Sequence, residues 1–245
     1  MSTDKFSERK MYMKQSKKLL CLILALAVAI SCMALAGCGE VKKGTKSIGG
    51  ANATTRSTTL TSEVATNDSV SPSGQTNIDR SDRKYIAIDV KDYGMITVAL
   101  YPKVAPITVE NILNLVSSGF YDGLTFHRIM EGFMIQGGDP KADGSGGSGN
   151  DIKGEFSSNG VKNDLSHLRG VISMARATPP DSASSQFFIV QKDSTFLDGN
   201  YAAFGEVTAG MDVVDAIVDD AKPTDNNGSI AKDKQPVINS IKVVG

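Results

Sequence analysis

Residues 125–139, with the sequence TFHRIMEGFMIQGGD, place a guanidinium group within an otherwise apolar stretch. Arg128 is followed closely by Phe133, Met134 and Gln136. A strand that serves only a hydrophobic core rarely carries an arginine, because a charge is costly to bury without a partner. The pattern therefore predicts a site with an apolar half and a polar half, with Arg128 supplying the charge.

The two faces of this predicted strand decide which side chains belong to the site. Successive residues of a strand point to opposite faces, so we expect Phe126, Arg128 and Met130 on one face. His127 should then lie on the other face as a buried, hydrogen-bonded structural residue. His167, the other histidine of the chain, precedes a predicted strand and is interpreted as a loop or turn residue. Two histidines are too few for a histidine-rich metal site.

A second group of aromatic residues lies further along the chain. In SSQFFIV, Gln186 and Phe188 are predicted to share one strand face, with Phe187 on the other. The segment STFLDGNYAAFG adds three more large side chains from a predicted loop: Phe196, Leu197 and Tyr201. By composition alone these side chains fit a core better than a binding site, and both interpretations stay open.

Two other chemistries have little support. GSGGSG, residues 144–149, matches G-x-G-x-x-G, but no strand-then-helix context surrounds it, and Asp143 and Asp151 would repel a pyrophosphate. A surface loop is the favoured interpretation. The serines that could suggest a hydrolase lack a G-x-S-x-G elbow: Ser182, Ser184 and Ser185.

Charge and cysteine content narrow the class of protein. Of 26 Lys/Arg and 27 Asp/Glu, six and two lie in residues 1–38, which leaves 20 basic and 25 acidic residues after them. An acidic remainder argues against a nucleic-acid binder, which would carry a basic surface. All three cysteines lie in residues 1–38, so the remainder has no disulfide and no cysteine-based metal site.

The first 38 residues are typical of a targeting segment. Lys17 and Lys18 precede an apolar run over residues 19–36, as in a secretory signal. The run ends in Leu-Ala-Gly-Cys, which resembles the bacterial lipobox, so residues 1–37 are predicted to be a lipoprotein signal peptide. Cys38 would then be lipidated, and an uncleaved signal anchor is the alternative. Residues 38–83 are predicted to be a flexible Ser/Thr/Gly-rich tether.

The remainder, residues 84–245, alternates short apolar runs with turn residues and two helical patterns. YIAIDV and GMITVALY predict a hairpin, and further strands are expected at 124–130, 133–136, 171–176, 186–191, 202–207 and 236–244. Helices are expected after Pro106 and over residues 211–219. Many strands with two helices indicate an antiparallel barrel or sandwich.

Four motifs together resemble the cyclophilin family of peptidyl-prolyl cis-trans isomerases. FHRIMEGFMIQGGD, GVISMARA, SSQFFIV and FLDGNYAAFGEVTAGMDVVDAI occur in the family's order and spacing, over essentially all of residues 84–245. The resemblance implies an all-β dominated fold, an eight-stranded antiparallel closed β-barrel capped by two α-helices. It also implies an isomerase that acts on X-Pro bonds without a metal or cofactor.

The resemblance assigns roles to individual residues. Arg128 looks like the catalytic arginine and Gln136 like the glutamine that supports it. The walls of a proline pocket are implied for Phe133, Met134, Phe188 and Leu197. Contacts to the peptide are implied for Ala175, Arg176 and Gln186. Phe196 stands where many members have tryptophan and Tyr201 where many have histidine, both at the pocket rim, so strong cyclosporin binding is not expected.

These expectations combine into one functional hypothesis. A monomeric isomerase, held to the membrane by a lipid at Cys38, would act on proline-containing exported polypeptides at the outer face of the cell membrane. The alternative is a proline-peptide-binding chaperone module whose catalysis is incidental. The pairing of Arg128 with Gln136 favours the isomerase, because a module that only binds needs the pocket but not that pair.

Overall fold

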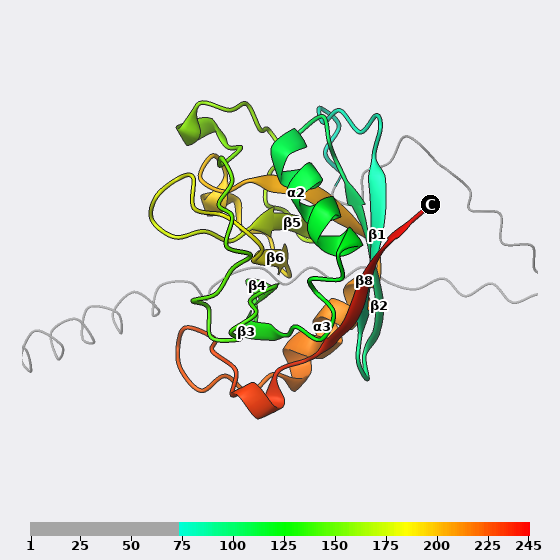
Figure 1. Cartoon of the computed structure of the whole chain (residues 1–245), viewed down its shortest axis with the longest axis vertical. Helices are drawn as coiled ribbons and strands as arrows, with labels where there is room; N and C mark the ends of the chain where they lie inside the picture. The colour runs from blue at the N-terminus through cyan, green and yellow to red at the C-terminus, as the bar shows by residue number, and fades with distance from the viewer. Residues whose placement is uncertain (1–73) are drawn as a thin grey trace, which may run out of the picture. The chain divides into compact units, whose positions relative to one another are not determined.

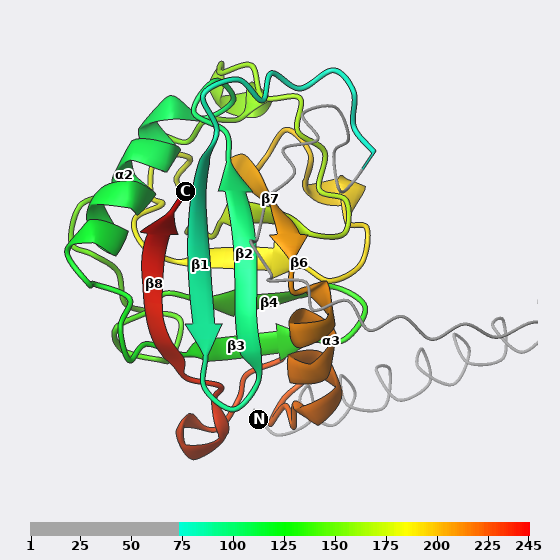
Figure 2. The same ribbon diagram turned by 90° about the vertical axis from the view of Figure 1, so that its right-hand side faces the viewer.

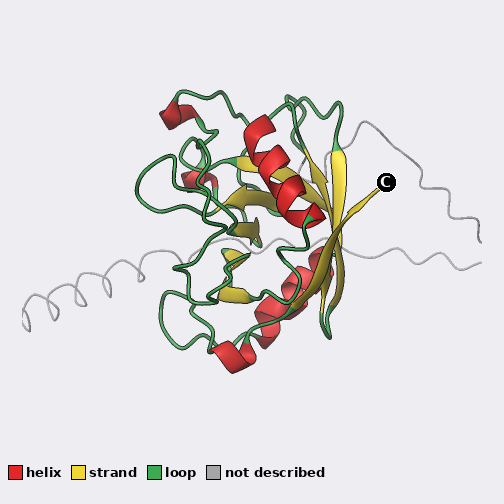
Figure 3. Cartoon of the chain, viewed as in Figure 1, coloured by secondary structure: helices red, strands yellow, loops and turns green. Residues whose placement is uncertain are grey.

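The computed structural model describes residues 74–245, and the predicted signal peptide and Cys38 lie outside them. Eight antiparallel strands form one curled sheet, with two α-helices beside it (Figure 3). The strands are β1 (Lys84–Val90), β2 (Gly94–Leu100), β3 (Phe126–Met130), β4 (Met134–Gly137), β5 (Val171–Met174), β6 (Phe187–Val190), β7 (Ala203–Ala209) and β8 (Ile238–Val244). The helices are α2 (Pro106–Ser117) and α3 (Met211–Asp220). No helix among residues 74–245 is both long and apolar enough to cross a membrane.

The predicted hairpin is confirmed by β1 and β2, which pair from Lys84 opposite Leu100 to Val90 opposite Gly94. Ile86, Ile88 and Val90 alternate inward and are buried, as a period of two requires. β8 pairs with the other side of β1, so the three strands lie side by side in Figure 2. The C-terminal strand predicted from PVINSIKVV is therefore confirmed as a neighbour of the first.

Both predicted helices are confirmed: α2 begins at Pro106, as predicted, and α3 begins at Met211. Pro106 occupies the first turn of α2, and Gly119 follows its end with a φ of +71°, a conformation that favours glycine. The carboxylate of Glu155 accepts the N–H groups of Ile107 and Thr108 at 3.1 and 2.7 Å. In Figure 1 and Figure 2, α2 lies toward the upper end of the curled sheet and α3 toward the lower end.

The closed barrel expected from the sequence is corrected to an open, curled sheet. The strand order is β3-β4-β6-β5-β7-β2-β1-β8, and within the described residues no ladder joins β3 to β8. The two edges meet around an isolated bridge between Thr125 and Val237, where the N–H groups of Phe126 and Ile238 donate to the carbonyl oxygens of Pro236 and Leu124. β8 then follows β1, and α2 packs against it. Strand patterns in a sequence do not specify this last pairing, because it depends on the angle at which the edges approach.

The sheet separates two apolar clusters. The larger is the core enclosed by the curled sheet and helices, and it contains Phe126, Phe187 and Phe204. The smaller lies on the other face of several strands and contains Met134, Phe188 and Leu197 among others. Phe187 and Phe188 thus go to different clusters, as predicted from strand alternation. The smaller cluster is the one that carries the site.

The segment before β1 contacts the domain, although the sequence predicts a flexible tether through residue 83. The side-chain amide of Gln75 makes two hydrogen bonds to the backbone of Ser166, at 2.8 and 3.0 Å. The guanidinium of Arg80 lies 3.2 Å from the buried carboxylate of Glu206, which also accepts the hydroxyl of Tyr101. A carboxylate without solvent needs such partners, so residues from Gln75 onward belong to the folded domain.

Candidate active site

A β-bulge in β3 determines which way Arg128 faces. Phe126 is opposite Gly137 and Arg128 is opposite Gln136, so His127 is an extra residue in its strand. Because of this bulge, Phe126 points into the large core while Arg128 lies beside the smaller cluster. The prediction that Phe126, Arg128 and Met130 share one face is therefore wrong for Phe126. The extra residue breaks the period of two that the prediction assumed.

The guanidinium of Arg128 is held from two sides. Its Nη1 donates to Oε1 of Gln136 at 3.2 Å, which is the contact that the resemblance implies. Its Nε donates to the carbonyl oxygen of Asn227 at 2.7 Å, and its Nη2 lies 3.2 Å from the Asn227 Oδ1. Burial lowers the pKa of Arg128 below its ordinary value, yet an arginine stays protonated at neutral pH. The site therefore presents a fixed, positively charged donor.

Asn227 is a member of the site that the sequence analysis missed. It lies in the loop between α3 and β8, and the next residue, Gly228, accepts the N–H of Ile129 at 2.8 Å. A side chain on Gly228 would start 2.4 Å from Met130 and 2.6 Å from the Ile129 carbonyl, so only glycine fits. The Asn-Asn-Gly-Ser turn was the available signal, but nothing in the sequence indicates that the turn reaches β3.

A small cavity of about 130 Å³ opens in front of Arg128. Its walls come from β3, β4, β6, the short 3-10 helix Thr195–Leu197 and the segments that follow or connect them. The structure brings together nine residues, all of them predicted for the site: Arg128, Phe133, Met134, Gln136, Ala175, Arg176, Phe188, Leu197 and Tyr201. Phe196 does not line this cavity. It is 71% exposed and packs against Phe133 at a ring distance of 5.5 Å, as a rim residue would.

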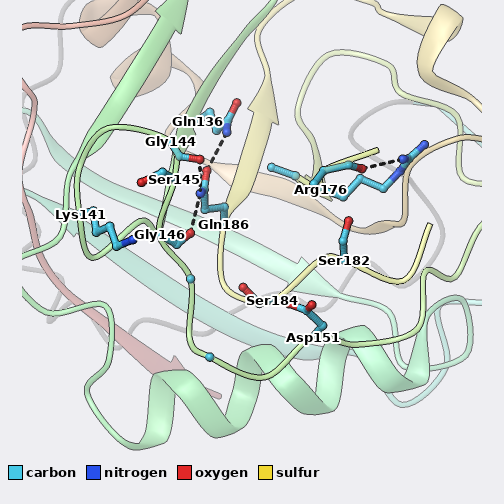
Figure 4. A pocket seen from close by; sticks show the side chains of 14 residues that line it. Gln136, Lys141, Gly144, Ser145, Gly146, Asp151, Arg176, Ser182, Ser184 and Gln186 are labelled. Atoms are coloured by element: carbon cyan, nitrogen blue, oxygen red, sulfur yellow. Dashed lines mark hydrogen bonds between the residues drawn. The ribbon is translucent and has the colours of Figure 1, made fainter. Parts of the chain in front are cut away.

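Gln186 lies beside the small cavity rather than in its wall. Its Oε1 accepts from Nε2 of Gln136 at 2.9 Å, and its Nε2 donates to the carbonyl oxygens of Gly144 and Gly146 (Figure 4). Gln186 lines a larger cavity of about 520 Å³, and Gln136 lines both this cavity and the small one. The GSGGSG loop lines the larger cavity, so this loop shapes a surface beside the site. It follows β4 without a succeeding α-helix, which agrees with rejection of the dinucleotide motif.

The charged and hydroxyl groups of the larger cavity come mostly from loops. Arg176 lines both cavities, and its guanidinium donates to three backbone carbonyl oxygens, those of Asn200, Ala177 and Thr178. Ser182 and Ser184 line this cavity too, without a hydrogen bond to either histidine. Ser185 is buried, and its hydroxyl donates to the carbonyl of Gly138 at 2.8 Å. The geometry of a serine hydrolase is thus not formed by these serines.

The two histidines have different surroundings. His127 is buried as predicted, but neither of its ring nitrogens has a hydrogen-bond partner among residues 74–245. The prediction that His127 is hydrogen-bonded is therefore wrong for the described part of the chain. His167 does lie in a loop, yet it is buried and bonded to Asp198 and Ser173. Burial lowers the pKa of both histidines below the ordinary value, so both are neutral at neutral pH.

Known proteins share this fold and sequence pattern. The family described as "Cyclophilin type peptidyl-prolyl cis-trans isomerase/CLD" matches residues 85–243. Peptidyl-prolyl cis-trans isomerase A of Dickeya dadantii is 42% identical over 162 residues, 62% of this chain and 80% of that protein. Peptidyl-prolyl cis-trans isomerase B of Bacillus subtilis is 45% identical over 123 residues, 50% of this chain and 82% of that protein.

A solved structure gives the same result. The crystal structure of a Cryptosporidium parvum cyclophilin type peptidyl-prolyl cis-trans isomerase in the presence of the dipeptide Ala-Pro is 30% identical to this chain. It aligns with a TM-score of 0.58 over 66% of this chain and 99% of that one. The family match covers well over half of the chain, and the relatives agree with it. The chain therefore belongs to the cyclophilin-type peptidyl-prolyl cis-trans isomerase family of enzymes.

Proposed function

We propose that this enzyme isomerises X-Pro bonds in exported polypeptides at the outer face of the cell membrane, with Arg128 as its catalytic residue. One observation supports the role of Arg128 above all others. Its guanidinium is held by Gln136 and Asn227 beside the small cavity that Phe133, Met134, Phe188 and Leu197 line, in contact with no carboxylate in the described residues. A charge held in this way is available to a ligand.

The barrier that such an enzyme must lower comes from amide resonance. Partial double-bond character sets a barrier of ~18–20 kcal/mol to rotation about the C–N bond. At an X-Pro bond the two isomers have similar energies but exchange over roughly tens to hundreds of seconds. In the twisted state the nitrogen regains its lone pair and becomes a better hydrogen-bond acceptor. A donor that binds this state more strongly than the planar one lowers the barrier.

Arg128 fits the role of that donor. It would donate to the prolyl nitrogen or stabilise the rotating carbonyl, while the cavity holds the ring and excludes water. Because Gln136 accepts from Nη1, the planar group keeps one orientation, and little reorganisation is needed as the bond twists. No covalent bond forms or breaks in this scheme, so no nucleophile takes part.

The apolar side chains in front of Arg128 define the position of the substrate. We place the proline ring among Phe133, Met134, Phe188 and Leu197, which line the small cavity. The peptide before the proline would then extend past Ala175 and Gln186 toward the larger cavity. The related Cryptosporidium protein was crystallised in the presence of Ala-Pro, which supports a proline-containing ligand for this chain as well.

The cellular location is proposed from the sequence, since Cys38 lies outside the described residues. Lipidation at Cys38 would hold the domain at the membrane, where newly exported chains emerge. Stable anchoring takes two acyl chains, each contributing about 0.8 kcal/mol per buried CH₂. Cys38→Ser should give an unprocessed precursor in cell fractions. Mature protein of unchanged size from this variant would contradict lipidation at Cys38.

The catalytic role is tested with a protease-coupled assay on a proline-containing test peptide. Arg128→Ala should lower kcat/KM by about ten-fold or more, with the fold retained, because it removes a transition-state donor. Arg128→Lys is the matched variant that keeps the charge. It should also be impaired, because lysine lacks the planar fork that binds Gln136 and Asn227 together. Near-normal turnover by Arg128→Ala would refute this role, and unimpaired peptide binding without catalysis in the wild-type chain would favour the chaperone module.

A further inference from the structure

A Ser-His-Asp chain, with a buried serine and histidine and an exposed aspartate, lies next to the small cavity. His167 is 1% exposed, and its Nδ1 lies 2.8 Å from Oδ1 of Asp198. Its Nε2 lies 3.0 Å from Oγ of Ser173. An ionised carboxylate only accepts hydrogen bonds, so Nδ1 of the neutral ring carries the proton and Nε2 accepts the serine hydroxyl. Both ring nitrogens are therefore satisfied, and the ring plane is fixed.

This arrangement has the order of a hydrolase triad but not its accessibility. Ser173 lies on β5 with no exposed surface, and its neighbours on that strand are also buried. A nucleophile must reach its substrate, so a hydrolytic role does not follow from this geometry. The three residues must instead be explained by what the histidine ring contacts.

The free face of the His167 ring packs against a wall of the site. It stacks on Phe188 with a centroid distance of 6.0 Å and an angle of 16° between the planes. Tyr201 meets both rings edge-on, at 6.5 Å from His167 and 6.0 Å from Phe188. Phe188 and Tyr201 both line the small cavity, whereas His167 does not. His167 thus contacts the rings of Phe188 and Tyr201, which line the cavity, without lining it itself.

The same chain reaches another wall through Asp198. Asp198 directly follows Leu197, which ends the short 3-10 helix and lines the small cavity. Its Oδ1 accepts the backbone N–H of His167 as well as the ring, and its Oδ2 accepts the hydroxyl of Ser166 at 2.5 Å. These bonds hold the Leu197 loop and the histidine in one unit. Two residues of the cavity wall, Phe188 and Leu197, are therefore linked through a single buried ring.

We infer that His167 is a positioning residue for the isomerase site, which sets the spacing between Phe188 and Leu197 through its bonds to Ser173 and Asp198. The inference rests on the proposed placement of the proline ring in this cavity. Contacts to the proline ring are the same in the planar and twisted states of the peptide. A change in their spacing therefore weakens substrate and transition-state binding alike, which raises KM and leaves kcat nearly unchanged.

The experiment compares two replacements of His167 in the full-length chain. His167→Asn keeps a donor for Asp198 but removes the ring, and it should raise KM about three- to ten-fold with kcat changed less than about two-fold. His167→Phe combined with Ser173→Ala restores a ring on Phe188 without an orphaned hydroxyl. Because this double variant forms no bond to Asp198 or to residue 173, its KM should stay raised, and a wild-type KM would overturn the inference by showing that ring stacking alone sets the spacing.

A destabilised control separates positioning from loss of folded protein. Val214→Ala truncates a buried side chain of α3 in the large core, whereas Phe188 belongs to the smaller apolar cluster. Loss of folded molecules lowers apparent kcat and leaves KM unchanged, which is the opposite pattern to that expected for His167→Asn. If His167→Asn has a wild-type KM, or changes only kcat as Val214→Ala does, the inference is wrong.

The NMR signals of the Phe188 ring distinguish failure of the inference from failure of the proposed function. The ring protons of Phe188, observed by NMR after selective labelling, respond to the stacked ring of His167 whether or not the enzyme turns over. A shift in these signals with an unchanged KM overturns the inference alone. A wild-type chain that neither binds nor isomerises a proline peptide overturns the proposed function and, with it, the inference.

Discussion

The two cavities beside Gln136 are built in different ways. The small one, of about 130 Å³, is lined mainly by large side chains, and strands β3, β4 and β6 supply four of its nine lining residues: Arg128, Met134, Gln136 and Phe188. The larger one, of about 520 Å³, is lined mainly by small and polar residues from the loops that contain residues 144–149 and 175–186. Side chains on paired strands are fixed by the ladder and by their rotamers. Loop residues depend on the few bonds that hold the loop.

The loop of the larger cavity is held by a small number of identifiable bonds. The Asp139 carboxylate accepts the backbone N–H groups of Lys141, Asp143 and Gly144. Gln186 holds the other side through the carbonyls of Gly144 and Gly146. We expect that the small cavity determines turnover, whereas the larger cavity adjusts the fit of the chain around the proline.

The largest difference should appear between the two bonded glutamines, Gln136 in the wall of both cavities and Gln186 in the wall of the larger one. Gln136→Ala removes the acceptor of Arg128 Nη1, and a misplaced catalytic group should cost about ten-fold in kcat. Gln186→Ala removes bonds to Gln136 and the loop only, so kcat/KM should fall about two- to three-fold. Steady-state kinetics of both variants test the order of these effects.

A double variant sharpens this prediction. Because Gln186 is bonded to Gln136, the loss from both replacements should be smaller than the sum of the two single free-energy changes. Additive effects would mean that Gln186 acts independently of Arg128. A larger loss from Gln186→Ala than from Gln136→Ala would reverse the ranking of the two cavities.

Acid should affect the larger cavity before the small one. Burial acts to raise the pKa of Asp139, but the backbone N–H groups of the loop outweigh it and lower the pKa below the ordinary value. A carboxyl with a lowered folded pKa stabilises the loop fully above its unfolded pKa of about 3.9, and this stability is lost as pH falls through the folded pKa. Arg128 keeps its charge throughout that range.

Hydrogen exchange tests this pH dependence at the loop. The amides of Gly144 and Gly146 should lose protection below about pH 4, after the exchange rates are corrected for pH, while amides of β4 and β6 stay protected. Asp139→Asn should show the reduced protection already at neutral pH. Equal protection of the loop in this variant would show that the charge of Asp139 does not hold it.

The sequence predicted the elements well but not the contacts between distant segments. Strand alternation correctly sent Phe187 and Phe188 to opposite faces, because both lie in the regular strand β6. The rule of strand alternation failed for Phe126, because the bulge at His127 inserts one extra residue into the strand, and no local sequence pattern indicates it. The eight strands were recoverable from local periodicity, whereas closure of the sheet depends on geometry at its two edges.

Most site residues were predicted from the motifs. The contacts that the sequence analysis missed are made by loop residues. Arg128 and Gln136 are eight residues apart and belong to one hairpin, so their contact follows from strand pairing. Asn227 is 99 residues from Arg128, and His167 meets Asp198 from 31 residues away. Such contacts depend on how loops cross the surface of the sheet. A single sequence shows which residues form a turn, but it does not show which distant residues the turn contacts.

The smallest effect is expected at Ser182, in the wall of the larger cavity. Its hydroxyl donates to the carbonyl of Pro179 at 2.6 Å, and it has no bond to Arg128, Gln136 or Gln186. Ser182→Ala should change kcat/KM for a short proline peptide by less than about two-fold, in line with the usual small effect of exposed substitutions. A peptide extended before the proline should show the larger change of the two, because only it reaches this wall. If the short peptide were affected as strongly as by Gln136→Ala, the two cavities would act as one site, and the division at the glutamines would have no functional meaning.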